Sequence, residues 1–263
     1  MHIAVFLKRI LDPEIPASRF RVDSARKDAH VPEAPYVMGP YDENALETAL
    51  MVKDKDPSAR VTVISYGPPE AEEILRKALS TGADDALLVL DEGGVHDAFH
   101  VAGVLAGAAR RAGSPDVLLF GLQSGDWDSG QTPFAVAELL GAPSVSFGTA
   151  VEPEGPDGLR VRRVLESGVE EIRLEARPVV LSVTNDGHNA LRMAKVKDIL
   201  AAKRKPVDRV AVQDLGPVPE SLVEVLDVAA PEAKKIACSF VEGESGAAKG
   251  QALAQRLLAE HLA

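Results

Sequence analysis

The sequence predicts an α/β protein with a mainly parallel, doubly wound sheet and helices on both faces, to which a β-hairpin excursion and an extended C-terminal arm ending in a helix are added. Short apolar runs alternate with segments of helical periodicity through residues 1–140, which is the pattern of successive βα units. The apolar run 117–120 leads directly into a loop rich in Gly, Ser and Asp and then into an apolar helix. After residue 148, hairpin signals replace the βα alternation.

Four strands and four helices are expected in the first half of the chain. The strands are expected at His2–Leu7, Arg60–Ser65, Ala86–Leu90 and Asp116–Phe120. The helices are expected at Asp42–Lys53, Glu70–Ser80, Asp97–Ala112 and about Gln131–Leu140, where apolar residues recur at helical spacing. Right-handed crossovers place the carboxyl ends of parallel strands at one edge of the sheet. That edge should be lined by Leu7-Lys8, Tyr66-Gly67, Leu90-Asp91 and Phe120-Gly121.

The second half begins with a hairpin, because Thr149–Pro153 and Leu159–Val164 flank the turn-forming residues 154–158. Val169–Leu174 predicts a further strand, and Pro178–Val183 predicts a buried strand that returns to the sheet. We therefore divide the chain into an α/β nucleotide-binding domain, residues 1–205, and an extended arm with a final helix, residues 206–263. The final helix, expected at Gly246–Ala263, has an apolar side that an arm cannot bury alone. We expect it to pack on a partner subunit, with packing on its own domain as the alternative.

Composition excludes several classes of protein. A net charge of −11 and a pI of about 5.1 disfavour a nucleic-acid partner. The one cysteine, Cys238, excludes an internal disulfide and a cysteine-based zinc cluster, and is expected to be a small buried residue. His96 and His100 share a helix face without a third ligand, so they are expected to be exposed and no metal site is predicted. No apolar run approaches a membrane span and no cleavage-site pattern is seen, which predicts no membrane insertion and a cytoplasmic location.

The loop 121–130 predicts a site for a phosphate-bearing ligand. A strand that feeds a glycine-rich loop at a helix start leaves free backbone N–H groups beside the positive end of the helix. The phosphate is expected on the N–H groups of residues 129–132, with the Thr132 hydroxyl as a further donor. Asp126 and Asp128 cannot donate to phosphate when ionised. They are expected to cap the helix or to accept from adenine or ribose, and ordinary turn residues are the alternative.

A series of motifs in a fixed order carries a family resemblance. The motifs are His2–Asp12, Met38–Glu47, Tyr66-Gly-Pro68, Leu75–Asp84, Gly121–Thr132 and, in a diverged form, Asn189–Pro206. In order and spacing they resemble the beta subunit of electron-transfer flavoprotein, over nearly the whole chain. The resemblance implies an adenine nucleotide alpha-hydrolase-like domain in a heterodimer, whose alpha subunit holds the redox FAD while the beta subunit buries a structural AMP.

The resemblance also implies an electron carrier of fatty acid oxidation that breaks no bonds itself and is therefore not an enzyme. Electrons arrive from flavin dehydrogenases such as acyl-CoA dehydrogenase and leave toward a quinone oxidoreductase. The diverged segment Asn189–Ile199 resembles the loop that docks dehydrogenases, which implies the partner-docking residues Met193, Val196 and Lys197. Val196 stands at the position of the family's apolar anchor, and the alternative is that it packs within a helix.

Carried over residue by residue, the resemblance implies a set of AMP contacts at the predicted sheet edge. The contacts are Phe6, Gly39, Pro40, Tyr41, Asp42, Tyr66, Gly121, Gln123, Asp126, Asp128, Ser129, Gly130, Gln131 and Thr132. Gly130 stands where the family often has Asn, which removes a side-chain donor. Pro133 stands where Gly is common, and a proline fits the first turn of a helix, where its missing N–H costs little.

Other functions remain open on the sequence alone. A bifurcating type of the same family would carry a second FAD in place of AMP. A standalone α/β nucleotide-binding module would need no flavin-bearing partner. An enzyme with its own catalysis is a further class, but no activated Ser, Cys or His constellation is visible. Residues 124–129 also resemble the Ser-Gly-Gly-x-Asp-Ser loop of ATP pyrophosphatases, although Asp126 stands at the second Gly.

Overall fold

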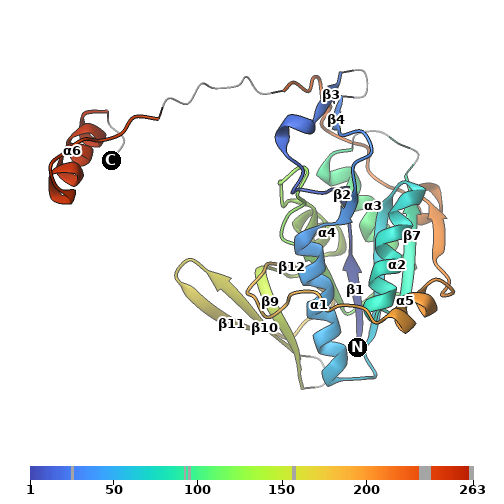
Figure 1. Ribbon diagram of the computed structural model, residues 1–263. Coiled ribbons are helices and arrows are strands. Elements are labelled where there is room, and N and C mark those ends of the chain that lie inside the picture. Colours follow the sequence, from blue (N-terminus) through green and yellow to red (C-terminus); the bar gives the residue numbers. More distant parts are fainter. Residues whose placement is uncertain (25–26, 92, 94–95, 156–157, 231–237, 261–263) are drawn as a thin grey trace. The chain divides into compact units, whose positions relative to one another are not determined.

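The computed structural model describes residues 1–24, 27–91, 93, 96–155, 158–230 and 238–260 (Figure 1). The chain divides into two compact units, Met1–Val228 and Ala229–Ala263. The larger unit contains every residue that the sequence analysis places at the nucleotide and docking sites. The described part of the smaller unit contains the helix α6 (Gly246–Ala259).

The larger unit is built on one twisted sheet with β1 (His2–Phe6) between β8 (Val117–Gly121) and β6 (Arg60–Gly67). In the described residues the sheet has nine strands, in the order β11-β10-β9-β12-β8-β1-β6-β7-β13. The remaining strands are β7 (Asp85–Leu90), β9 (Ser144–Glu154), β10 (Gly158–Leu165), β11 (Gly168–Leu174), β12 (Val179–Val183) and β13 (Asp208–Ala211). All neighbours from β9 to β13 pair in parallel, whereas β10 and β11 are antiparallel. The mainly parallel sheet with a hairpin is confirmed.

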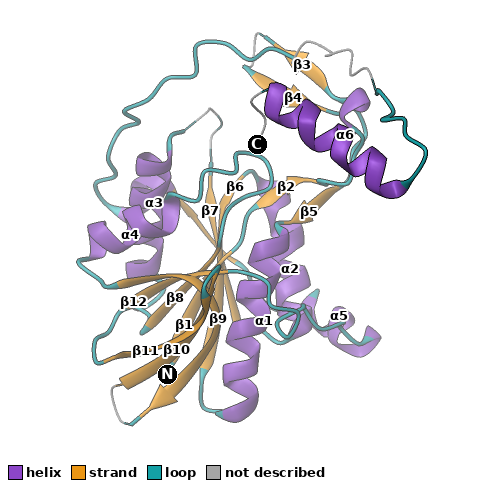
Figure 2. Ribbon diagram, turned by 90° about the vertical axis from the view of Figure 1, so that its left-hand side faces the viewer, coloured by secondary structure: helices purple, strands orange, loops and turns teal. Residues whose placement is uncertain are grey.

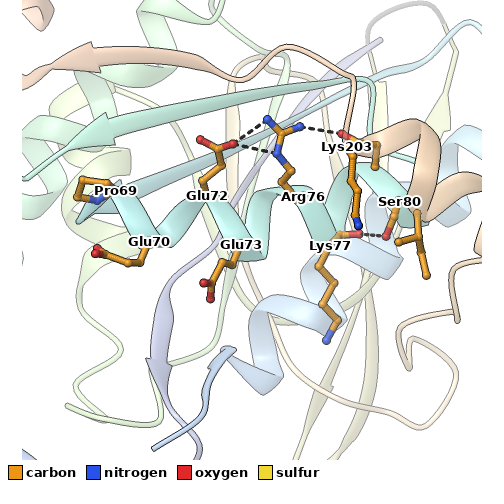
Figure 3. Close-up of a pocket in the computed structure, with 10 residues that line it drawn as sticks. Pro69, Glu70, Glu72, Glu73, Arg76, Lys77, Ser80 and Lys203 are labelled. Atoms are coloured by element: carbon orange, nitrogen blue, oxygen red, sulfur yellow. Dashed lines mark hydrogen bonds and ion pairs between the residues drawn. The ribbon is translucent and has the colours of Figure 1, made fainter. Parts of the chain in front are cut away.

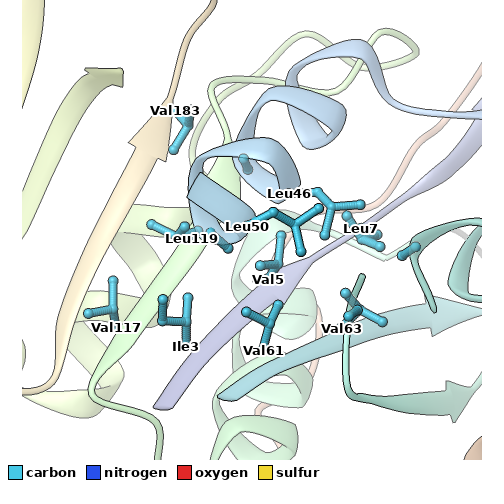
Figure 4. Packing of buried hydrophobic residues seen from close by; sticks show 14 of the residues in the cluster. Ile3, Val5, Leu7, Leu46, Leu50, Val61, Val63, Val117, Leu119 and Val183 are labelled. Atoms are coloured by element: carbon cyan, nitrogen blue, oxygen red, sulfur yellow. The ribbon is translucent and has the colours of Figure 1, made fainter. Parts of the chain in front are cut away.

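Helices cover both faces of this sheet, as predicted (Figure 2). One face carries α1 (Pro40–Lys55), α2 (Glu72–Thr81) and the short α5 (Val196–Ala202). The opposite face carries α3 (Ala98–Arg111) and α4 (Thr132–Leu140). The two layers have separate hydrophobic cores, filled mostly by Val, Leu, Ile and Ala. Figure 4 shows the core beneath α1, where its leucines meet the valines of the central strands.

The sheet has a topological switch point between β1 and β8. The helix that follows β1 is α1, which packs in one core, and the helix that follows β8 is α4, which packs in the other. The loops that leave these neighbouring strands therefore separate toward opposite faces. In doubly wound folds this separation opens a crevice at the carboxyl ends of the strands, where ligands bind. We refer to it as the switch-point crevice.

The long β9 is the main departure from the predicted second half. Its first residues pair in parallel with β12 and its last residues pair with β10, with an irregular register near Phe147, which has a positive φ of 58°. One strand thus serves both the parallel sheet and the hairpin, so it starts at Ser144 and not at Thr149. The predicted turn 154–158 includes residues 156–157, which lie outside the described residues.

Small elements that the sequence analysis did not predict occupy residues 9–38. β2 (Arg9–Leu11) pairs with β5 (Tyr36–Met38), and β3 (Arg21–Asp23) pairs with β4 (Asp28–His30). A short 3-10 helix, η1 (Ala17–Arg19), lies between them in sequence, and a second, η2 (Pro69–Ala71), precedes α2. Strands of three residues are too short to show an alternating pattern, which is why this stretch gave no prediction.

Part of the predicted C-terminal arm belongs to the sheet. Residues 208–211 form β13, which pairs in parallel with β7, and η3 (Val212–Leu215) follows it. The prediction that an extended arm begins at residue 206 was therefore wrong for residues 208–215. β13 is short, and only Val210 in it is buried. The sequence there shows no alternation of apolar and polar residues that would predict a strand. The compact units divide after Val228, not after residue 205.

The smaller unit has little core of its own. In the part of it that the structure describes, no residue of α6 is buried, and the predicted end of the helix at residues 261–263 lies outside the described residues. Cys238 is exposed, so its predicted burial was wrong; among the residues described in this unit none is buried, so none forms an apolar interior around it. No helix in the described residues is both long enough and apolar enough to cross a membrane.

Candidate functional site at the switch-point crevice

The predicted carboxyl edge exists. Leu7, Gly67, Leu90 and Gly121 end or follow the neighbouring parallel strands β1, β6, β7 and β8. The residues that follow β1 and β7 bond to β6 between them, from Leu7 N–H to Ile64 O at 2.9 Å and from Asp91 N–H to Gly67 O at 3.0 Å. The edge residues expected from the βα pattern are thus brought to one side of the sheet.

Asp42 bridges the two strands that border the crevice. It lies in the first turn of α1 and is buried. One carboxylate oxygen accepts the N–H of Lys8 at 2.8 Å, and the other accepts the N–H of Gly121 at 3.2 Å. Burial raises the pKa of Asp42 to about 7, although the two backbone N–H donors favour the ionised form. Asp42 therefore joins the ends of β1 and β8 from the α1 side.

Glycines make room for this carboxylate. A Cβ at Gly121 would collide with an oxygen of Asp42 and would also meet the backbone of residues 41 and 42. A Cβ at Gly39 would lie 2.8 Å from the other oxygen. Both positions were predicted as ligand contacts, and the structure gives them a steric role beside Asp42 as well. Pro40 begins α1, and Tyr41 follows it at the same edge.

The glycine-rich loop folds back over the end of β1. The ammonium of Lys8 lies 2.7 Å from the carboxylate of Asp126, which also accepts the N–H of Trp127 at 3.0 Å. Asp128 has a positive φ of 56°, and its N–H donates to the Ser124 carbonyl at 2.9 Å. The N-cap of α4 is Gln131, so the prediction that Asp126 or Asp128 caps this helix was wrong. Each aspartate instead shapes the loop.

The start of α4 offers free donors beside this loop. No side chain of the described residues caps α4. Among those residues, the N–H groups of Ser129, Gly130, Gln131 and Thr132 also find no acceptor. Pro133 lies in the first turn, as predicted. Gly130 has a φ of 61°, and a Cβ there would lie 3.1 Å from the Leu122 carbonyl oxygen. Free N–H groups at a helix start form a ready site for an anion.

Aromatic side chains support the floor of the edge. The rings of Phe6 and Phe120, the last apolar residues of β1 and β8, stack with centroids 4.1 Å apart and an interplanar angle of 2°. Both are buried, so Phe6 has little surface to offer a ligand. The Tyr66 hydroxyl donates to Asp91 at 3.3 Å, and burial raises the pKa of Tyr66.

A histidine pair lies beside Tyr66. The rings of His96 and His100 stack at 4.4 Å, and His96 Nε2 is 3.2 Å from an oxygen of Asp91. Both histidines are partly buried, so the prediction that they are exposed was wrong. His96 precedes α3, whose N-cap is Asp97, so the two residues do not share a helix face as expected; contacts with Asp91 and with the Pro219 carbonyl oxygen cover them instead. No cluster that could hold a metal ion is found among the described residues.

The predicted docking residues lie elsewhere, on the segment that leads into α5. Met193 is 95% exposed and Val196 is 75% exposed, and Lys197 is exposed. Val196 and Leu200 are four residues apart on one face of α5, Met193 lies in the segment just before the helix, and all three are exposed. Val196 begins α5 with its side chain in solvent, so the alternative that it merely packs in a helix was wrong.

The backbone behind these exposed side chains is fixed to α1. Arg192 pairs with Glu47 at 2.7 Å and with Asp54 at 2.7 Å, and its own N–H donates to Glu47 at 3.0 Å. These bonds raise the pKa of Arg192 and lower that of Asp54. Asn189 is buried, donates to the Thr184 carbonyl at 2.8 Å, and its own carbonyl accepts from Asn44 at 2.9 Å. The segment therefore presents Met193 and Val196 from a rigid support.

A groove of 680 Å³ lies next to this surface, between α2 and α5 (Figure 3). Ile199 belongs to α5 and lines the groove. Arg76 spans it, with its guanidinium 2.7 Å from Glu72 and 2.7 Å from the Ala202 carbonyl oxygen. None of the residues predicted to hold a nucleotide lines this groove.

The fold and the switch-point crevice define the class: a doubly wound α/β protein whose sheet edge carries a glycine-rich loop with free N–H groups at a helix start. The electron transfer flavoprotein domain matches residues 31–215. The chain belongs to the electron transfer flavoprotein beta subunit family. It is 32% identical over 235 residues to the electron transfer flavoprotein subunit beta of Bradyrhizobium diazoefficiens, a match that covers 89% of this chain and 91% of the relative.

Other relatives agree with this assignment. The electron transfer flavoprotein subunit beta of Clostridium acetobutylicum is 34% identical over 216 residues, covering 82% of this chain and 80% of the relative. The caffeyl-CoA reductase-Etf complex subunit CarD of Acetobacterium woodii is 33% identical over 188 residues, covering 71% of each chain. Members of this family are electron-transfer proteins.

Proposed function

We propose that this chain is the beta subunit of a heterodimeric electron-transfer flavoprotein and that it holds AMP as a structural ligand in the switch-point crevice. The observation that carries the proposal is the set of free N–H groups of residues 129–132 at the start of α4. They fit one phosphate of a small nucleotide, which the helix dipole also favours. Gly130 lets the backbone approach that phosphate.

The other predicted contacts surround this phosphate position in the proposal. Phe6, Tyr66 and residues 39–42 belong to the same carboxyl edge and would border the adenosine part. Asp126 is held by its ion pair with Lys8. In the proposal its oxygens accept hydrogen bonds from a ribose hydroxyl or from the adenine amino group. Asp42 would act mainly through the backbone, by holding the strands on both sides of the ligand.

In this proposal the chain supports an FAD that the alpha subunit holds, and α6 clamps that subunit. The hydroxyl of Ser245, the residue before α6, caps this helix, and the helix exposes Leu253 and Leu258. An exposed leucine pair on a helix without buried residues is suited to packing on a second chain. The flavin supplies the redox chemistry, while this chain supplies binding and orientation. We infer no catalytic group of its own.

The exposed side chains of Met193, Val196 and Leu200 are the surface we propose for flavin dehydrogenases such as acyl-CoA dehydrogenase. One or two aliphatic side chains on a rigid support give a small contact, which suits a transient encounter between redox partners. Electrons would then pass to a quinone oxidoreductase. Lys197 lies at the rim, where a charge affects the rate of encounter more than the affinity.

Co-expression with the alpha subunit of the same organism tests the heterodimer. We expect a 1:1 complex with the absorption spectrum of bound flavin. The double variant Leu253→Asp, Leu258→Asp should not assemble with the alpha subunit, although the isolated chain should keep its secondary structure. A stable homodimer that ignores the alpha subunit would support the standalone module instead.

A further inference from the structure

The two loops that border the switch-point crevice are joined to each other beyond the strand ends. Lys8 follows β1, and Asp126 lies in the loop that follows β8, 118 residues further along the chain. The Lys8 ammonium lies 2.7 Å from one oxygen of the Asp126 carboxylate and 2.9 Å from the other. Because these loops lead to helices on opposite faces of the sheet, the ion pair spans the crevice between them.

The carboxylate end of this ion pair is presented by a compact turn, residues 124–128, which we call the loop tip. The N–H of Asp128 donates to the Ser124 carbonyl at 2.9 Å and closes the turn. The Asp126 carboxylate accepts the N–H of Trp127 at 3.0 Å. The side chain of Asp126 is therefore fixed to its own backbone, and it moves together with the loop tip.

A second approach holds the loop tip against the segment that follows β1. A Cβ at Gly125 would lie 3.0 Å from the side chain of Ile10 and 3.9 Å from that of Pro13, and Ile10 is buried. The Lys8 N–H donates to Asp42 at 2.8 Å, so the backbone that carries the ammonium is fixed as well. The loop tip thus rests on this segment through one ion pair and one close approach.

The crevice is therefore bridged at two levels. At the strand ends, Asp42 joins β1 to β8 through the N–H groups of Lys8 and Gly121. Further along the same two loops, the Lys8 side chain joins them again through Asp126. The N–H groups of residues 129–132, which find no acceptor among the described residues, directly follow the loop tip. A phosphate on these groups would lie next to a loop that the second bridge holds in place.

The second bridge is of a kind that can open. The side chains of Lys8 and Asp126 are 44% and 32% exposed, and ion pairs in such positions change an equilibrium by a factor of about five at most. The pair is therefore too weak to stabilise the sheet. It is strong enough to change how often the loop tip separates from the segment that follows β1.

Resting on the proposed function, we propose that Lys8 and Asp126 form a clasp across the switch-point crevice, which sets the rate at which the bound nucleotide leaves. Lys8 is thereby a further residue of the nucleotide site, outside the set of contacts expected from the sequence. The nucleotide leaves when the clasp opens and the loop tip moves away. A carboxylate can accept about four hydrogen bonds, so Asp126 can hold Lys8 and a ribose hydroxyl at the same time.

A double-mutant cycle on the complex with the alpha subunit tests the clasp. Lys8→Met removes the ammonium and keeps a long side chain, and Asp126→Asn removes the charge but keeps an acceptor for the Trp127 N–H. The heterodimer is loaded with radiolabelled AMP, and release is followed after excess unlabelled AMP is added. Each single variant should release AMP about threefold to fivefold faster than the wild type. The double variant should release it no faster than either single variant, because both remove the same interaction.

Salt separates a clasp from a general effect on the fold. Higher ionic strength should speed AMP release from the wild type, because salt screens an exposed ion pair, and should leave release from the double variant unchanged. Lys55→Met is the matched control. Lys55 forms a partly exposed ion pair with Glu152 at the C-terminal end of α1, away from the crevice, so this variant should release AMP at the wild-type rate.

Two results would overturn the clasp. One is release from both single variants at the wild-type rate. The other is a double variant in which the two single effects multiply, because Lys8 and Asp126 would then act on the nucleotide separately. A wild-type heterodimer that binds no AMP would instead count against the proposed function, so the two failures are distinguishable.

Discussion

Asp42 and Gly121 are 79 residues apart in sequence and share a buried hydrogen bond, in which the carboxylate of Asp42 accepts the Gly121 N–H at 3.2 Å. The same carboxylate accepts the Lys8 N–H. One side chain from α1 thereby fixes the ends of both strands that border the switch-point crevice. The geometry of the crevice depends on this carboxylate and on the absence of a side chain at Gly121.

Gly121→Ala should destabilise the fold. Its Cβ would collide with Asp42 and with the backbone of residues 41 and 42, and overpacking of this kind costs about 2 kcal/mol in the free energy of unfolding. Chemical denaturation measures the loss. Gly246→Ala is the control, because nothing lies within 4 Å of a Cβ built there. If Gly121→Ala lowers the free energy of unfolding no more than Gly246→Ala does, the contact between Gly121 and Asp42 is not tightly packed.

Asp42 should also make stability depend on pH. Burial raises its pKa to about 7 in the folded chain, from 3.8 as the ordinary value. A raised pKa means that the folded state binds the proton more tightly, so this stabilisation is complete below about pH 4 and is lost as the pH rises through 7.

We therefore compare the wild type with Asp42→Asn, which resembles the protonated form. The free energy of unfolding of the wild type should fall relative to the variant between about pH 4 and pH 7, by at most about 1.4 kcal/mol per pH unit. Urea denaturation at several pH values measures the difference. A difference that stays constant across this range would contradict the assignment to Asp42.

Gly130→Val should expel the nucleotide and weaken assembly with the alpha subunit. Gly130 has a φ of 61°, and its Cβ would approach the Leu122 carbonyl oxygen beside the free N–H groups. Gly141→Val is a matched control, because Gly141 has a φ of 62° at the other end of the same helix, with open space around it. Both variants bear the backbone strain, of order 1 kcal/mol, but only the first should lose AMP. Full AMP content in Gly130→Val would refute the phosphate position.

Val196→Asp should slow electron transfer from a dehydrogenase. A charge at the exposed anchor position would have to lose its hydration when the dehydrogenase docks. The second-order rate constant for flavin reduction by acyl-CoA dehydrogenase should therefore fall about tenfold or more. Stopped-flow absorbance measures it. Val169→Asp is the control, since Val169 is exposed on β11. Equal effects of the two substitutions would mean that docking does not use the 193–200 surface.

The order of strands and helices could be predicted because each main element of the first half is long enough to show the periodicity of a strand or a helix. Eight apolar or alternating runs became strands of the sheet, with ends displaced by a few residues. β13 was not predicted because an edge strand of four residues with one buried side chain is too short to show an alternating pattern. The burial of β13 against β7 is decided by tertiary contact, not by local pattern.

The site was predicted in part for the same reason. The loop 121–130 and the edge residues could be located because they come directly after the predicted strands, whose ends can be recognised in the sequence. The role of Asp42 does not, since a polar residue in the first turn of a helix is normally an exposed one. The hydrogen bonds of His100 with Pro219 and of Asp97 with Leu222 join segments more than a hundred residues apart, and no spacing in the sequence predicts them.

The nucleotide content of the native heterodimer tests the central claim most directly. The complex should be purified anaerobically with its alpha subunit, denatured, and the released nucleotides identified and counted by mass spectrometry. The account predicts one FAD and one AMP per heterodimer. Two FAD and no AMP would indicate the bifurcating type, and a crevice without any adenine nucleotide would contradict the account.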